Sequence, residues 1–197
     1  MRKELSIQNT GGNQGIMVNN NSGTITMSLK GAVQISSSIS KIVQVLGDLC
    51  CDENEDDNPP LDLQQYKMNE KIEYNSVIGY RPIIEEFSSY YYTCDNYLNR
   101  YDDSNMRGKT KILQWVHMRY LRAKGKVLLE NRESEESEIN IIRKNADRII
   151  EMVNDKIYDV VINSKGIEEA DIEGIELGIS CFTCYCFMEC KILEKPI

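Results

Sequence analysis

Hydrophobic residues recur at helical spacing along most of this chain, and the first 29 residues follow a different pattern. Between residues 30 and 50 the apolar positions lie close to an i, i+3, i+4, i+7 repeat, which predicts one helix with a wide buried face. Similar repeats between residues 61 and 197 predict further helices. They cover residues 69–77, 82–101, 106–131, 137–163 and 168–196.

The connections between the predicted helices are short. Residues 102–105 and 131–134 are two examples, and short connections favour antiparallel packing of neighbouring helices. We therefore predict a mainly α fold in which residues 61–197 form an antiparallel, up-and-down helical bundle. A helix over residues 30–50 and a small Asn/Gly-rich β segment precede this bundle.

The β segment covers residues 1–29 and combines short strand-like runs with turn residues. The runs at 4–9, 15–20 and 23–29 alternate polar and apolar residues, and Asn and Gly separate them because both tolerate tight β-turns. So small a meander is marginally stable alone. We expect strands of another copy to complete it, which makes it an oligomerisation module, with a flexible arm as the alternative. The candidate contact residues are Ile7, Ile16, Val18, Ile25 and Met27.

An acidic segment over residues 51–60 is predicted to be a linker. It holds five acids between Asp52 and Asp57 and ends with Pro59 and Pro60. Like charges repel one another and two prolines end a helix, so the segment is expected to be exposed. Its spacing lacks the calcium-loop pattern, which argues against a metal site.

Length and charge narrow the functional classes. The chain has 197 residues and a formal net charge of −8, which favours solubility and argues against general attraction to nucleic acid or anionic membranes. No signal-peptide pattern opens the chain, and no apolar run approaches the roughly 18 residues of a membrane span. We expect a cytoplasmic protein without a membrane partner.

Seven cysteines are expected to be reduced thiols in that compartment. Cys181, Cys184, Cys186 and Cys190 include a Cys-x-x-Cys pair and are the candidate metal ligands. On one long helix, however, Cys186 and Cys190 would lie nearly opposite the first two. We therefore expect buried thiols that act as small hydrophobic residues, and no metal or other cofactor.

Signatures of catalysis are weak. Gly108-Lys109-Thr110 imitates the end of a phosphate-binding loop, but Asp103 stands where the first glycine is needed. His117 is the one histidine, and no nucleophile is tied to it by spacing. We assign no catalytic residue and expect a protein that is not an enzyme. A site assembled only in three dimensions stays open.

The segment 106–127 carries seven basic residues and no acid. Such a basic face suits a phosphate backbone or the acidic surface of a protein. The alternative is that its charges pair with acids of the same chain, in the segments 52–57 or 132–138. The basic residues are Arg107, Lys109, Lys111, Arg119, Arg122, Lys124 and Lys126.

Four stretches of the helical region carry a family resemblance. They are MNEKIEYNSVIGYRPIIEEF, KTKILQWVHMRYLRAKGKVL, INIIRKNADRIIEMV and CFMECKILEKP. Residues 60–196 resemble the C-terminal helical domains of bacterial ABC-three-component, Lamassu-like anti-phage systems, and the Asn/Gly segment is similar to short β modules of such proteins. The resemblance implies an accessory module that assembles with an ATPase or effector subunit.

Taken with that resemblance, the residues favour a non-enzymatic assembly protein. Its N-terminal strands are expected to self-associate into a homo-oligomer, and its helical bundle is expected to dock a partner. The alternative is a nucleic-acid-sensing subunit that uses the basic segment 106–127.

Overall fold

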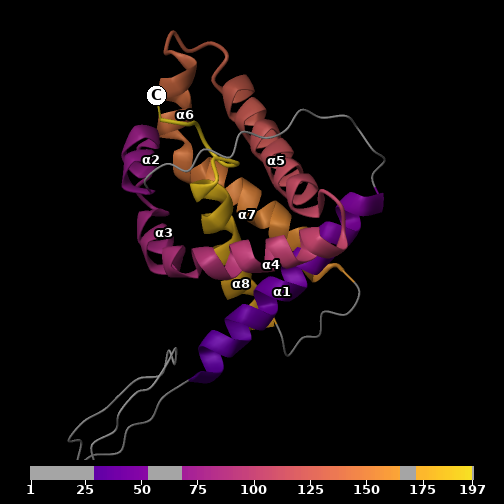
Figure 1. Ribbon diagram of the computed structural model, residues 1–197. Helices are drawn as coiled ribbons and strands as arrows, with labels where there is room; N and C mark the ends of the chain where they lie inside the picture. The colour runs from indigo at the N-terminus through magenta and orange to yellow at the C-terminus, as the bar shows by residue number, and fades with distance from the viewer. Residues whose placement is uncertain (1–28, 53–67, 165–171, 197) are drawn as a thin grey trace, which may run out of the picture.

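The computed structural model describes residues 29–52, 68–164 and 172–196, and these are helical almost throughout (Figure 1). The prediction of a mainly α fold is confirmed, and no strand occurs in those ranges. The proposed β segment and its five candidate contact residues lie outside them, as do residues 53–60 of the acidic linker. The elements are α1 (Leu29–Asp52), α2 (Met68–Asn75), α3 (Arg81–Phe87), the 3-10 helix η1 (Ser88–Tyr90), α4 (Tyr91–Ser104), α5 (Gly108–Glu130), α6 (Glu138–Lys144), α7 (Ala146–Ile162) and α8 (Ile172–Met188).

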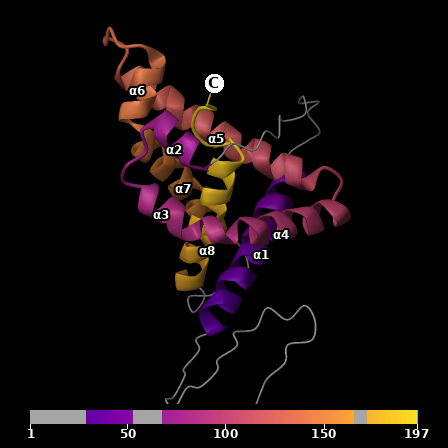
Figure 2. The same ribbon diagram turned by 60° about the vertical axis from the view of Figure 1, so that its left-hand side comes forward.

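Helix α8 is the centre of the core. It packs against α1, α3, α4 and α7, and in Figures 1 and 2 α4 runs across both α1 and α8. Every residue from Cys181 to Phe187 is buried. A helix that is apolar on nearly all sides is stable only when other helices surround it, which explains why α8 occupies this position.

Helices α1 and α8 cross closely at Gly178. A Cβ added there would lie 2.9 Å from Cδ1 of Ile42 and 3.0 Å from Cβ of Ser38. Both distances are below ordinary van der Waals contact. The glycine therefore sets how closely these two helices approach each other.

Two predicted helices are broken in the structure. The helix expected over 82–101 divides into α3, η1 and α4, and the helix expected over 137–163 divides into α6 and α7 at Asn145. The Nδ2 group of Asn145 donates to the carbonyl oxygen of Ile141 at 2.8 Å. An asparagine amide that bonds its own backbone competes with the helical pattern, so the chain bends there while the hydrophobic repeat continues.

The prediction of a helix through residue 196 was wrong over its last eight residues. Helix α8 ends at Met188, and Cys190 adopts a left-handed conformation with φ 55°. Its N–H donates to Phe187 O at 3.1 Å, and the N–H of Lys191 donates to Cys186 O at 2.9 Å. These two bonds form the Schellman motif that closes many helices. The expected signal was missing, because glycine or asparagine usually occupies the position of Cys190.

None of the helices within the described ranges combines the length and the apolar character needed to cross a membrane.

Candidate functional site

Two regions bring together residues that could bind a partner. One is the exposed side of α5, which contains most of the predicted basic segment. The other is the contact that residues 189–196 make with α2 and α5. We call these residues the tail segment. Helix α5 contributes residues to both regions.

The seven basic residues do not act as one surface. Lys109 is held by α4, because its Nζ lies 2.7 Å from Oδ1 of Asp95 and 2.8 Å from Oδ1 of Asn99. The hydroxyl of Tyr185 also donates to Asp95, at 2.9 Å. Burial favours a higher pKa for Asp95, but the hydrogen bonds from Lys109 and Tyr185 outweigh it and lower that pKa.

Gly108 and Lys109 therefore serve packing rather than phosphate binding. A Cβ on Gly108 would lie 2.6 Å from Cδ1 of Tyr101, so only glycine fits beside that ring. The phosphate-binding lysine of a true loop must be available for the ligand, whereas Lys109 is engaged with Asp95.

Lys124 is also engaged within the chain. Its Nζ lies 2.7 Å from Oε1 of Glu138 and 2.7 Å from Oε1 of Glu194. Burial alone would lower the pKa of Lys124, but its bonds to the two carboxylates raise it. Glu138 belongs to the acidic segment 132–138, so for Lys124 the intramolecular alternative holds.

Arg119 is half-buried and stacks on an aromatic ring. Its guanidinium carbon lies 4.3 Å from the centroid of Trp115, a distance at which a cation is attracted to the ring face. Its guanidinium group is thus in contact with Trp115.

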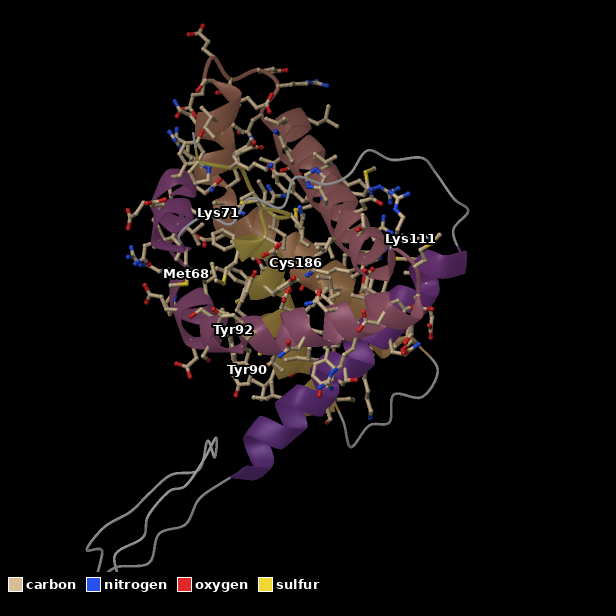
Figure 3. The ribbon with its side chains drawn as sticks, viewed as in Figure 1. Met68, Lys71, Tyr90, Tyr92, Lys111 and Cys186 are labelled. Carbon is tan, nitrogen blue, oxygen red and sulfur yellow. The ribbon has the colours of Figure 1, made fainter. Side chains whose placement is uncertain are left out.

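The exposed side of α5 carries Lys111, Arg122 and Lys126 together with apolar side chains, whereas Arg107 precedes the helix in a left-handed conformation. Positions 111, 118, 122, 125 and 129 repeat at spacings of seven, four, three and four residues, which places them on one side of a helix. We call this the outer face; it consists of Lys111, Met118, Leu121, Arg122, Gly125, Lys126 and Leu129. Lys111 is labelled near the N-terminal end of α5 in Figure 3.

Three apolar residues of the outer face are unusually exposed. The exposed fractions are 47% for Met118, 41% for Leu121 and 65% for Leu129. No atom lies within 4 Å of the position that a Cβ on Gly125 would take. The outer face thus presents apolar side chains, basic side chains and a backbone that a second molecule can approach closely.

The tail segment is fixed to α2 by a reciprocal pair of hydrogen bonds. The Nδ2 of Asn75 donates to the carbonyl oxygen of Glu194 at 2.9 Å, and the N–H of Glu194 donates to Oδ1 of Asn75 at 3.0 Å. Asn75 is fully buried. Its amide therefore satisfies both polar backbone groups of one tail residue inside the protein.

Lys71 is the second anchor of the tail segment, and its side chain is only 1% exposed. Its Nζ donates to Ile192 O at 2.8 Å and to Phe187 O at the end of α8. The charge also lies 4.5 Å from the centroid of the Phe187 ring. Burial lowers the pKa of Lys71 to about 8. Figure 3 labels Lys71 on α2 and Cys186 on α8.

Helix α5 supplies the other side of the tail contact. The hydroxyl of Tyr120 and the Nζ of Lys124 both bind Oε1 of Glu194. Burial favours a higher pKa for Glu194, but these two partners outweigh it and lower that pKa. Nδ1 of His117 lies 3.2 Å from Lys191 O, and burial lowers the pKa of His117.

We call these five residues the tail groove: Lys71, Asn75, His117, Tyr120 and Lys124. The sequence analysis missed Lys71, Asn75 and Tyr120, because their partners lie more than 70 residues away and no local spacing marks them. It assigned Lys124 to a basic face, and the structure pairs it with the tail segment.

The four clustered cysteines are buried. Burial raises the pKa of Cys181 and of Cys184 to about 12 and raises that of Cys186 well above its usual value. Metal ligation needs thiolates, and raised pKa values keep these thiols protonated. Within the described ranges no group of three or more His, Cys, Asp or Glu side chains is arranged to hold a metal ion.

A hollow of about 250 Å³ lies between α1 and α4. It is lined by hydroxyl, amide, phenol and guanidinium groups, and His117 is not among them. The lining residues are Ser40, Val43, Gln44, Tyr97, Arg100, Tyr101 and Ser104.

Comparison of the chain with protein-family models, with curated proteins and with solved structures finds no match.

Proposed function

We propose that this chain is a non-enzymatic assembly protein that docks a partner protein through the outer face of α5. The observation that carries the proposal is the composition of that face: three exposed apolar side chains alternate with basic ones on a helix that is otherwise packed into the core. Exposed apolar residues that gather on one side of a helix are typical of protein interfaces.

The chemistry of the outer face favours an acidic, amphipathic helix as the partner element. Lys111, Arg122 and Lys126 supply positive charge, and the outer face contains no acid. Leucines of a partner helix would cover Met118, Leu121 and Leu129, and glutamates would meet the basic residues. Gly125 would lie under the crossing point of the two helices, where the absence of a side chain lets the backbones approach each other.

The same geometry makes a nucleic-acid interface the weaker candidate. Lys109 and Lys124 are neutralised by acids of the same chain, and Arg119 lies against Trp115. A phosphate backbone is bound by many basic residues that act together, and exposed leucines between them would meet water or phosphate.

For the biological setting we propose the one that the resemblance implies. We propose that the helices form an antiparallel bundle of the kind found in anti-phage accessory modules, and that the docked partner is an ATPase or effector subunit. We also propose that residues 1–29 self-associate, so that one assembly presents several outer faces.

The docking proposal is tested by fluorescence anisotropy on the full chain. The probes are a labelled helix-forming peptide with leucines on one side and glutamates beside them, the same peptide with glutamines, and a labelled DNA duplex. The variants are L121S/L129S and R122E/K126E. Matched controls are L177S on α8 and K156E on α7, which change an exposed leucine and an exposed lysine elsewhere.

We expect the glutamate peptide to bind the wild-type chain at least tenfold more tightly than either outer-face variant, and the controls to resemble the wild type. The glutamine peptide should bind more weakly. The proposal is wrong if the DNA duplex binds with steep salt dependence while the peptide does not bind, or if outer-face and control variants bind the peptide equally.

A further inference from the structure

We propose that the tail groove is a peptide-recognition site, and that the tail segment is the ligand it holds within the same chain. The class of ligand is a short peptide with two apolar residues followed by an acid, as in Ile192, Leu193 and Glu194. This site is separate from the outer face of α5 and does not depend on the docking proposal.

The tail groove binds the backbone of the tail segment at three residues. His117 meets the carbonyl oxygen of Lys191, Lys71 donates to that of Ile192, and Asn75 bonds both the N–H and the carbonyl oxygen of Glu194. A side-chain amide that binds both polar groups of one residue replaces the partner strand that an extended peptide would otherwise need. Backbone bonds of this kind provide affinity that does not depend on the peptide's sequence.

Side-chain contacts add selectivity. Ile192 is 0% exposed and Leu193 is 2% exposed, so both are buried in the core. The carboxylate of Glu194 is bound by Tyr120 and by Lys124. A peptide with a polar residue at either apolar position, or without the acid, would leave a buried group without its partner.

The junction with α8 separates the tail segment from the helix. Cys190 holds a left-handed conformation with φ 55°, which is unfavourable for a non-glycine residue, and Leu193 holds another with φ 62°. Contacts between the tail segment and the rest of the protein must maintain these conformations. Because the tail segment is tethered beside the groove, its effective concentration is high, and a second peptide competes only when the tail segment is weakened.

The experiment keeps the full chain and weakens only its own ligand. In the variant I192D/L193D the groove residues are unchanged, but the tail segment carries two charges that cannot be buried. The probe is a labelled peptide of residues 189–196 with the wild-type sequence, and the control is the same peptide with L193D. Binding is measured by anisotropy under reducing conditions, after circular dichroism has shown that the variant is helical.

We expect the wild-type peptide to bind I192D/L193D at least tenfold more tightly than it binds the wild-type chain, and the L193D peptide not to bind. Adding K124E to the chain should weaken binding about tenfold, and a peptide with E194K should restore it, because the ion pair is then reversed. A folded variant that does not bind the peptide would overturn the proposal.

Hydrogen exchange of the wild-type chain decides the matter if I192D/L193D does not fold. A separable ligand leaves its groove by a local opening, so the amides of residues 191–194 should exchange faster than those of 181–187 and respond little to dilute urea. Exchange of both segments only through global unfolding would show that the tail segment is an integral part of the core, and the proposal would fail.

Discussion

Lys71 shows how a single residue connects the end of α8 with the tail segment. Its ammonium group donates to carbonyl oxygens of Phe187 and Ile192 in a buried position. The Phe187 carbonyl lies in the last turn of α8 and carries the negative end of its dipole, which favours a cation. Burial opposes the charge more strongly, and the pKa of Lys71 falls from 10.5 to about 8.

This pKa predicts a stability that depends on pH. Between about pH 8 and 10.5 the unfolded chain keeps the Lys71 proton and the folded chain has lost it, so unfolding takes up a proton. The free energy of unfolding therefore rises with pH in this window, by about 3 kcal/mol from this group. In K71M that contribution is absent.

Urea unfolding of the wild-type chain and K71M at a series of pH values measures the effect. We expect the stability difference, wild type minus K71M, to be constant below pH 8 and to increase from pH 8 to 10.5. Titrations of tyrosines, and of cysteines that do not interact with Lys71, are common to both chains and cancel. Parallel stability curves across the window would show that Lys71 keeps its ordinary pKa in the folded protein.

At the scale of elements, the hydrophobic repeat predicted the helices better than it predicted their ends. It located α1, α2, α5 and α8, because burial of one side is a property of the local sequence. It missed the break at Asn145 and the end of α8 at Met188. Neither feature is marked by a typical sequence signal. The break depends on an asparagine amide that bonds its own backbone, and the helix end depends on a cysteine in a left-handed conformation.

The close crossing of α1 and α8 yields a prediction with a matched control. G178A would force a methyl group against Ile42 and Ser38, and overpacking of this kind costs about 1–3 kcal/mol. G125A meets no atom within 4 Å, so it should raise the free energy of unfolding by about 0.5–1 kcal/mol through helix propensity.

Thermal or urea unfolding of the two variants provides the comparison. The expected result is opposite signs for the same chemical change on two helices. If G178A is as stable as G125A, α1 and α8 can move apart without a loss of stability. The close crossing would then not define the core.

The whole molecule joins an α8 that is fully buried from Cys181 to Phe187 to an α5 with an exposed outer face. The basic segment 106–127 was visible in the sequence. The sequence did not show which of its basic residues pair with acids of the same chain and which remain exposed. Glu194 lies 70 residues from Lys124 in the chain, and Asp95 reaches Lys109 from another helix. Helical spacing alone places Lys111, Arg122 and Lys126 on one side of α5 with Met118, Leu121 and Leu129, but only the folded chain shows that this side is exposed.

Site-specific photo-crosslinking of the full chain in the cells that produce it tests the docking claim most directly. The photoreactive residue is placed at Leu121 or Leu129 on the outer face, and at Leu177 or Ile78 as exposed controls. We predict adducts to one protein at the two outer-face positions only, mapped to an acidic amphipathic helix and reduced by R122E/K126E. Equal adducts at all four positions, or adducts to nucleic acid at the outer face, would contradict the account.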